Sequence, residues 1–196
     1  MNRDKDYRTE HLNPMPFEEY GKHVRKLMAR IREYLAKNKI AFDAVAPILR
    51  SGGVPGGMLA VYFDIPVMIP LQFKYRYRPT RLEQVLPFPR LKDPLPERPK
   101  ILICENNTSS GETARTAVGV IRERYPAATI FYATVAKVYG GPDVIEGVEE
   151  SFYGVRTNER LLATAEQARA FDLRADVTLF PWEVAEKELS EMNAFS

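Results

Sequence analysis

Hydrophobic and polar positions alternate with two different periods along the chain. From residue 17 to 38, apolar side chains recur every three or four positions and Lys or Arg fills much of the opposite face, which is typical of an amphipathic helix. Short, mostly apolar runs at 42–49, 100–104 and 129–136 have the length and composition of buried strands. Further patterns predict strands at 65–69 and 176–182 and helices at 58–63, 113–124 and 183–192. Strands that alternate with helices predict an α/β fold whose central sheet is mainly parallel and flanked by helices.

Some segments lack this periodicity. Residues 1–15 are polar and predict an N-terminal arm, and 72–98 hold many of the 15 prolines, which predicts a long, flexible, lid-like loop. That loop would either reach a phosphorylated ligand or form a solvated basic surface, because it interleaves Lys74, Arg76, Arg78 and Arg81 with Tyr75 and Tyr77. Residues 139–175 are mixed, with a helix indicated over 163–171. We expect a single domain over 1–196.

Composition narrows the function classes. The chain has 28 Lys and Arg against 26 Asp and Glu, a net charge of +2, so it lacks the bulk positive field expected of a nucleic-acid-binding protein. One Cys and two His exclude an internal disulfide framework and argue against a His/Cys zinc site. Scarce cysteine predicts a reducing, cytoplasmic location. The apolar runs are far shorter than a membrane span, so no membrane contact is expected.

A loop rich in hydroxyl groups joins the strand at 100–104 to the helix at 113–124. Gly111 allows a tight turn and a close approach of ligand to backbone, and the free N–H groups at the helix start favour a phosphate dianion. The candidate phosphate-binding residues are Thr108, Ser109, Ser110, Gly111, Glu112 and Thr113. A plain helix N-cap made of Ser and Thr is the alternative interpretation.

A glycine-rich loop, 50–57, follows the strand at 42–49 in the same way. Its glycine pairs expose backbone amides and Arg50 adds a positive charge, a combination that suits pyrophosphate; the alternative is a flexible turn. The candidate pyrophosphate-binding residues are Arg50, Ser51, Gly52 and Gly53. Neither loop has the spacing of a P-loop or of a dinucleotide fingerprint.

Together the two loops resemble those of the type I phosphoribosyltransferases. Residues 101–113 resemble the motif that binds phosphoribosyl pyrophosphate (PRPP), and 50–57 resembles the pyrophosphate loop of the bacterial xanthine-guanine and archaeal hypoxanthine branches. Lys137 matches a lysine that contacts the 6-oxo group in the purine enzymes. The run from Phe180 to Glu183 matches their Phe-Pro-Trp-Glu ending.

The resemblance implies a type I phosphoribosyltransferase fold with a small hood lobe at 139–182. It implies transfer of ribose-5-phosphate to or from a 6-oxopurine-like base, with PRPP or a nucleoside 5′-monophosphate as the small-molecule partner, in a homodimer or tetramer. Glu105 and Ser109 would occupy the catalytic positions, Glu105 and Asn106 would hold the ribose, and Lys137, Val177 and Thr178 would hold the base. Mg²⁺ would be the cofactor, held through water by Glu105.

The sequence departs from the family pattern where chemistry is expected. Asn106 and Ser109 replace acidic residues, so the motif keeps one carboxylate, at Glu105. A Ser without a neighbouring base transfers no proton at neutral pH. Glu112 adds a negative charge to the phosphate loop. Val177 stands where the family has an aromatic residue that stacks on the base. At this spacing Phe180 and Trp182 are interpreted as core or interface residues. The alternative function is therefore a non-catalytic regulatory protein that binds a nucleotide or PRPP without turnover.

Overall fold

The computed structural model describes residues 7–76, 79, 81–157, 166, 170 and 177–194. Among these residues, the helices are a short 3-10 helix (Thr9–His11), α1 (Phe17–Asn38), α2 (Gly53–Tyr62), α3 (Glu112–Arg124) and α5 (Ala185–Ala194). The strands are β1 (Leu12–Pro14), β2 (Ala44–Leu49), β3 (Val67–Met68), β4 (Leu71–Arg76), β5 (Arg81–Gln84), β6 (Lys100–Thr108), β7 (Thr129–Val138), β8 (Glu150–Thr157) and β9 (Val177–Leu179).

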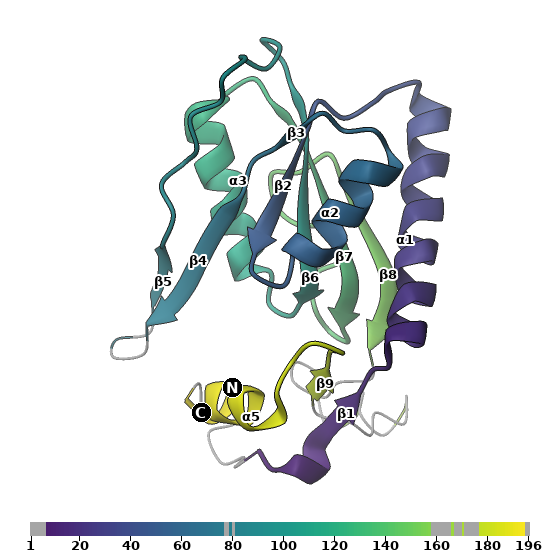
Figure 1. Cartoon of the computed structure of the whole chain (residues 1–196), viewed down its shortest axis with the longest axis vertical. Coiled ribbons are helices and arrows are strands. Elements are labelled where there is room, and N and C mark those ends of the chain that lie inside the picture. The colour runs from purple at the N-terminus through teal and green to yellow at the C-terminus, as the bar shows by residue number, and fades with distance from the viewer. Residues whose placement is uncertain are drawn as a thin grey trace.

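A seven-stranded sheet forms the centre of the molecule, in the order β5-β4-β2-β6-β7-β8, with β3 paired to β2 off this path. All of these pairs are parallel except the antiparallel β4–β5 pair. Helices α1 and α2 cover one face and α3 covers the other (Figure 1), and a separate apolar cluster fills each side. The predicted α/β fold with a mainly parallel central sheet is confirmed. The apolar runs predicted its central strands because a strand that is buried on both faces needs apolar side chains on both.

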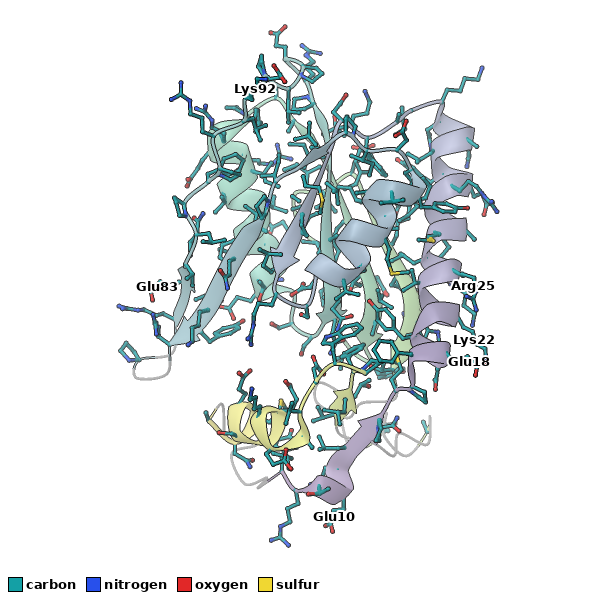
Figure 2. The ribbon with its side chains drawn as sticks, in the orientation of Figure 1. Glu10, Glu18, Lys22, Arg25, Glu83 and Lys92 are labelled. Atoms are coloured by element: carbon teal, nitrogen blue, oxygen red, sulfur yellow. The ribbon has the colours of Figure 1, made fainter. Side chains whose placement is uncertain are left out.

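Helix α1 shows how the periodicity of the sequence becomes packing. Its apolar stripe, which includes Leu27 and Ile31, is buried against the sheet, and each fully buried side chain of this kind stabilises the fold by about 1.5–3 kcal/mol. Glu18, Lys22 and Arg25 point away from the sheet (Figure 2). The helix ends at the predicted residue because the next one, Lys39, adopts a left-handed conformation with φ of 52°, a common helix stop.

The segment 72–98 differs from the long irregular loop that the prolines predicted. Strands β4 and β5 form a hairpin at the edge of the large sheet, and the irregular part is confined to 85–99. The hairpin is stabilised by a long-range pairing of β4 with β2, which local composition does not reveal. Tyr77 and Arg78 lie outside the described residues.

Strand β6 is longer than its apolar run. The polar segment 105–108, predicted as part of a loop, continues the strand because its backbone stays paired with β7 as far as Thr108. Helix α2 likewise begins earlier than predicted, at Gly53, so the second loop shrinks to 50–52.

A small second sheet pairs β1 with β9 in parallel. It lies with α5 beyond the carboxyl ends of β2, β6 and β7 (Figure 1), the position expected of a hood. The composition of this hood differs from the prediction: β8, which falls within 139–182, is an edge strand of the large sheet, and the expected arm contributes β1. These pairings join residues more than 160 positions apart, so no local pattern indicates them. The helix expected over 163–171 falls mostly outside the described residues.

None of the helices in the described part of the chain is both long and apolar enough to cross a bilayer.

Candidate functional site at the carboxyl edge of the sheet

The two loops that the sequence analysis singled out meet at one edge of the large sheet. Strands β2 and β6 are adjacent and parallel, so the segments 50–52 and 109–111 that follow them leave the same edge and face the hood (Figure 1). The carboxyl edge of a parallel sheet is where ligands bind in open α/β folds. The fold therefore brings together residues separated by more than 50 positions in sequence.

The loop 50–52 is held tightly against the sheet. The Leu49–Arg50 peptide bond is cis, and the backbone N–H of Gly52 donates to the carbonyl of Ile48 at 3.0 Å. A Cβ atom at position 52 would lie 2.4 Å from the Ile48 oxygen and 2.7 Å from the Cys104 oxygen, so only glycine fits between β2 and β6. Arg50 is exposed and its charge acts on Glu188 of α5, which places the hood helix opposite this loop.

The loop 109–111 has the geometry of a helix start that could also receive a phosphate. Gly111 adopts φ of 76°, a left-handed conformation that favours glycine. The Ser110 hydroxyl lies 3.4 Å from the backbone nitrogen of Glu112, and Arg115 donates to the Ser110 carbonyl at 3.1 Å. Both interpretations of this loop, an N-cap and a phosphate site, use the same N–H groups.

Glu112, the first residue of α3, interacts with the hairpin. The Tyr75 hydroxyl of β4 donates to Oε2 of Glu112 at 3.0 Å, and burial raises the pKa of Tyr75 to about 12, so this hydroxyl keeps its proton. A carboxylate here already complements the positive end of the helix dipole. Arg76 pairs with Glu83 within the hairpin at 2.7 Å.

Thr108 does not join the loop but ends β6 and faces inward. Its hydroxyl lies 2.6 Å from the Tyr132 hydroxyl, which donates to Oε2 of Glu105 at 2.5 Å. Burial raises the pKa of Glu105 to about 7, although the hydrogen bond from Tyr132 acts in the opposite direction. Sequence reasoning missed Tyr132, because one tyrosine within the apolar run of β7 reads as a core residue.

Lys137 lies beside Thr108 in the β6–β7 ladder and its side chain is engaged. Its ammonium group is 3% exposed and pairs with Asp143, 5.3 Å from the centre of the Tyr153 ring. Arg156 donates to the same Asp143 oxygen at 2.9 Å, and the two cations hold the pKa of Asp143 below its ordinary value. The assigned contact of Lys137 with a 6-oxo group stays a prediction, and it would require Lys137 to exchange its carboxylate partner.

Comparisons with known proteins identify the family of the chain. The family model for the phosphoribosyl transferase domain matches residues 17–159, a range that includes both loops and Glu105. The chain belongs to the phosphoribosyl transferase domain family. A comparison with curated protein sequences finds no match.

Solved phosphoribosyltransferases share the fold. The purine phosphoribosyltransferase from Pyrococcus horikoshii Ot3 is 16% identical, with a TM-score of 0.62 over 89% of this chain and 95% of that one. The xanthine-guanine-hypoxanthine enzyme of Helicobacter pylori is 15% identical, with a TM-score of 0.63 over 92% and 99%. A hypothetical protein from Neisseria gonorrhoeae, solved with bound ppGpp, is 15% identical, with a TM-score of 0.60 over 95% and 98%. The predicted type I phosphoribosyltransferase fold is confirmed.

The hood positions that the family uses for the base are buried in strand β9. Val177 and Thr178 pair with Leu12 and Asn13 of β1 and are 8% and 4% exposed. Their assignment to the base stays a prediction.

Phe180 and Trp182 are confirmed as packing residues. Trp182 meets the Tyr20 ring edge-on at 4.7 Å and stacks with Phe180 at 6.0 Å, which attaches the hood to α1. The next residue, Glu183, completes the turn by accepting a hydrogen bond from the Phe180 backbone N–H at 2.8 Å.

The residues at the motif fit Mg²⁺ poorly as direct ligands. Among the described residues no group of three or more His, Cys, Asp or Glu could hold a metal ion. Glu105 has one oxygen engaged by Tyr132 and takes up a proton near neutral pH, and Mg²⁺ prefers ionised carboxylates. Asn106 is 1% exposed, which leaves little surface for ribose or metal. The magnesium assignment stays a prediction from the resemblance.

Proposed function

We propose that the chain binds PRPP or a nucleoside 5′-monophosphate at the carboxyl edge of the sheet and transfers ribose-5-phosphate to or from a 6-oxopurine-like base. The observation that carries the proposal is the junction at Gly52, where the loop after β2 packs on the Cys104 carbonyl of β6. This contact sets the glycine-rich loop next to Glu105 and the phosphate loop. Two structural neighbours named as purine enzymes support the choice of base class.

Each part of the substrate would have its own group of residues. The 5′-phosphate would lie on the N–H groups and hydroxyls of 109–113, where the α3 dipole favours negative charge. The pyrophosphate would lie on 50–53 with Arg50. Glu105 would accept hydrogen bonds from the ribose hydroxyls, between the two anion sites.

Transfer breaks the bond between C1′ and the pyrophosphate oxygen and forms one between C1′ and a base nitrogen, through a sugar with cationic character. The two loops would stabilise the departing negative charge, and the hood would exclude water. The attacking nitrogen must lose its proton, and Ser109, which stands where the family motif has an acidic residue, is a poor base at neutral pH. We therefore expect slow turnover with neutral bases.

The second candidate is a non-catalytic nucleotide-binding regulator. The ion pair of Lys137 with Asp143 favours it, because the ammonium group that would recognise the base already has a carboxylate partner. Asn106 and Ser109 favour it as well, since neither supplies charge or accepts a proton readily.

Two measurements test the proposals. Isothermal titration with PRPP and Mg²⁺, and separately with GMP and IMP, should show binding that Arg50→Ala weakens for PRPP more than for GMP. A matched control is Arg25→Ala on the outer face of α1. Absence of binding to all three ligands would contradict both candidates.

Turnover is tested by release of pyrophosphate from PRPP with guanine, hypoxanthine and xanthine. Release above the background without protein favours the transferase, and binding without release favours the regulator.

A further inference from the structure

One hydroxyl group links the ribose end of the candidate site to its phosphate end. The Tyr132 hydroxyl donates to Glu105 at 2.5 Å and lies 2.6 Å from the Thr108 hydroxyl. Tyr132 is 2% exposed, so no solvent competes for either bond. Thr108 is the last residue before the phosphate loop 109–111.

Glu105 is the carboxylate that would accept hydrogen bonds from the ribose hydroxyls, so the orientation of its side chain affects ribose binding. Its Oε2 atom accepts the hydrogen bond from Tyr132, and the residue as a whole is only partly buried. A carboxylate with one oxygen fixed can present the other in a single direction, which reduces the entropy lost when a ligand hydroxyl binds. Neighbouring Asn106 and Asn107 each bury an amide oxygen without a partner among the described residues.

We propose that Tyr132 is a positioning residue, which fixes Oε2 of Glu105 so that the other carboxylate oxygen faces the ribose hydroxyls, and which joins this group to Thr108 at the start of the phosphate loop. The inference rests on the proposed nucleotide site. It gives Tyr132, a residue of β7, a part in ribose binding beside the motif residues of β6.

The test compares the affinities of GMP and 2′,3′-dideoxyguanosine 5′-monophosphate by titration calorimetry at pH 8. Both ligands carry the same phosphate and base, so the ratio of their affinities isolates the contact with the ribose hydroxyls. The natural protein should bind GMP more tightly, because only GMP offers hydroxyls to Glu105.

Tyr132→Phe should lower this preference by about tenfold, the size of one hydrogen bond to a charged group. Its affinity for the dideoxy ligand should stay unchanged, because that ligand makes no contact through ribose hydroxyls, whereas general damage to the site would weaken both ligands. Thr108→Val, which keeps Tyr132, should give a smaller loss of preference in the same direction. Tyr34→Phe removes a hydroxyl on α1 at the other end of the sheet and should change neither quantity.

The outcomes separate the two claims. Absence of GMP binding by the natural protein contradicts the proposed function. Binding with the natural preference in Tyr132→Phe overturns the positioning role and leaves the proposed function standing. If Tyr132→Phe fails to fold, as judged by circular dichroism, Thr108→Val decides: an unchanged preference overturns the proposal. Glu105→Gln should lower the preference at least as much as Tyr132→Phe, and a natural preference in that variant would also overturn the proposal.

Discussion

Asn106 occupies a position at the end of β6 where a charge would find no partner. Its side chain is 1% exposed and its Oδ1 atom has no hydrogen bond within the described chain. A carboxylate in that place would lose hydration without gaining a counter-charge, so its pKa would rise. The burial of this position is consistent with a neutral Asn where the family motif has an acidic residue.

Asn106→Asp is therefore expected to destabilise the fold by about 1–3 kcal/mol at pH 8. The folded-state pKa of the new carboxyl is raised, so the unfolded chain releases its proton first and the loss of stability should shrink as the pH falls toward 5. Urea unfolding at both pH values measures this. Asn13→Asp, at an exposed position, is the control and should stay within about 0.5 kcal/mol of the natural chain; equal loss in both variants would contradict the explanation.

Glu112 places a negative charge at the start of α3, where a phosphate would bind. Glu112→Gln should strengthen GMP binding by about two- to fivefold at low salt, the effect of one charge at a helix terminus. The gain should fall with added salt because the side chain is exposed and screening weakens such pairs. Glu123→Gln, near the other end of α3, should leave the affinity unchanged, and a weaker affinity in Glu112→Gln would indicate that the carboxylate assists the site.

At the scale of secondary-structure elements, the contact between β2, β6 and α2 determines the shape of the glycine-rich loop. The backbone at Gly52 packs against carbonyl oxygens of both strands, and neither oxygen can move without breaking the sheet. A side chain is therefore excluded at Gly52, immediately before α2. Within α2, an added Cβ at Gly56 would lie 2.7 Å from the Pro47 Cβ, whereas Gly57 has open space around it.

Gly52→Ala should destabilise the protein by about 2–4 kcal/mol, in the range of overpacked or strained sites, and should abolish PRPP binding in whatever fraction stays folded. Gly57→Ala is a matched control in the same helix, where an added Cβ has nothing within 4 Å, and it should be neutral or stabilising by about 0.5–1 kcal/mol. Thermal unfolding followed by titration with PRPP gives both quantities. Equal effects of the two substitutions would contradict the steric explanation.

At the scale of the whole molecule, the hood is attached by a small aromatic cluster. Trp182 and Phe180 pack on Tyr20 of α1, and the β1–β9 pair completes the attachment. The hood thus shares these residues with the core under α1, and its position depends on packing outside the candidate site.

Trp182→Ala should cost about 2–4 kcal/mol of stability, as expected for a partly buried aromatic, and should expose the hood to protease before the sheet unfolds. Limited proteolysis with mass spectrometry measures the order of cleavage. Val61→Ala, at a side chain 85% exposed, should leave the pattern unchanged. Simultaneous cleavage of the hood and the sheet in Trp182→Ala would contradict a separable hood.

The sequence by itself determined the α/β class, the extent of α1 and the positions of both candidate anion-binding loops. These depend on local signals, namely the period of apolar residues, glycine pairs and hydroxyls before a helix. The burial of Phe180 and Trp182 was predicted from the same kind of spacing, and they pack as expected.

Only the tertiary structure decided which side chains meet. Tyr132 joins Glu105 and Thr108 because β6 and β7 are paired in one register, and Lys137 forms an ion pair because the loop after β7 folds back and brings Asp143 to it. The hood draws β1 and β9 from opposite ends of the chain, and the hairpin of β4 and β5 depends on β2. A hydrogen bond or ion pair depends on distances between atoms remote in sequence, and only packing of the whole chain fixes those distances.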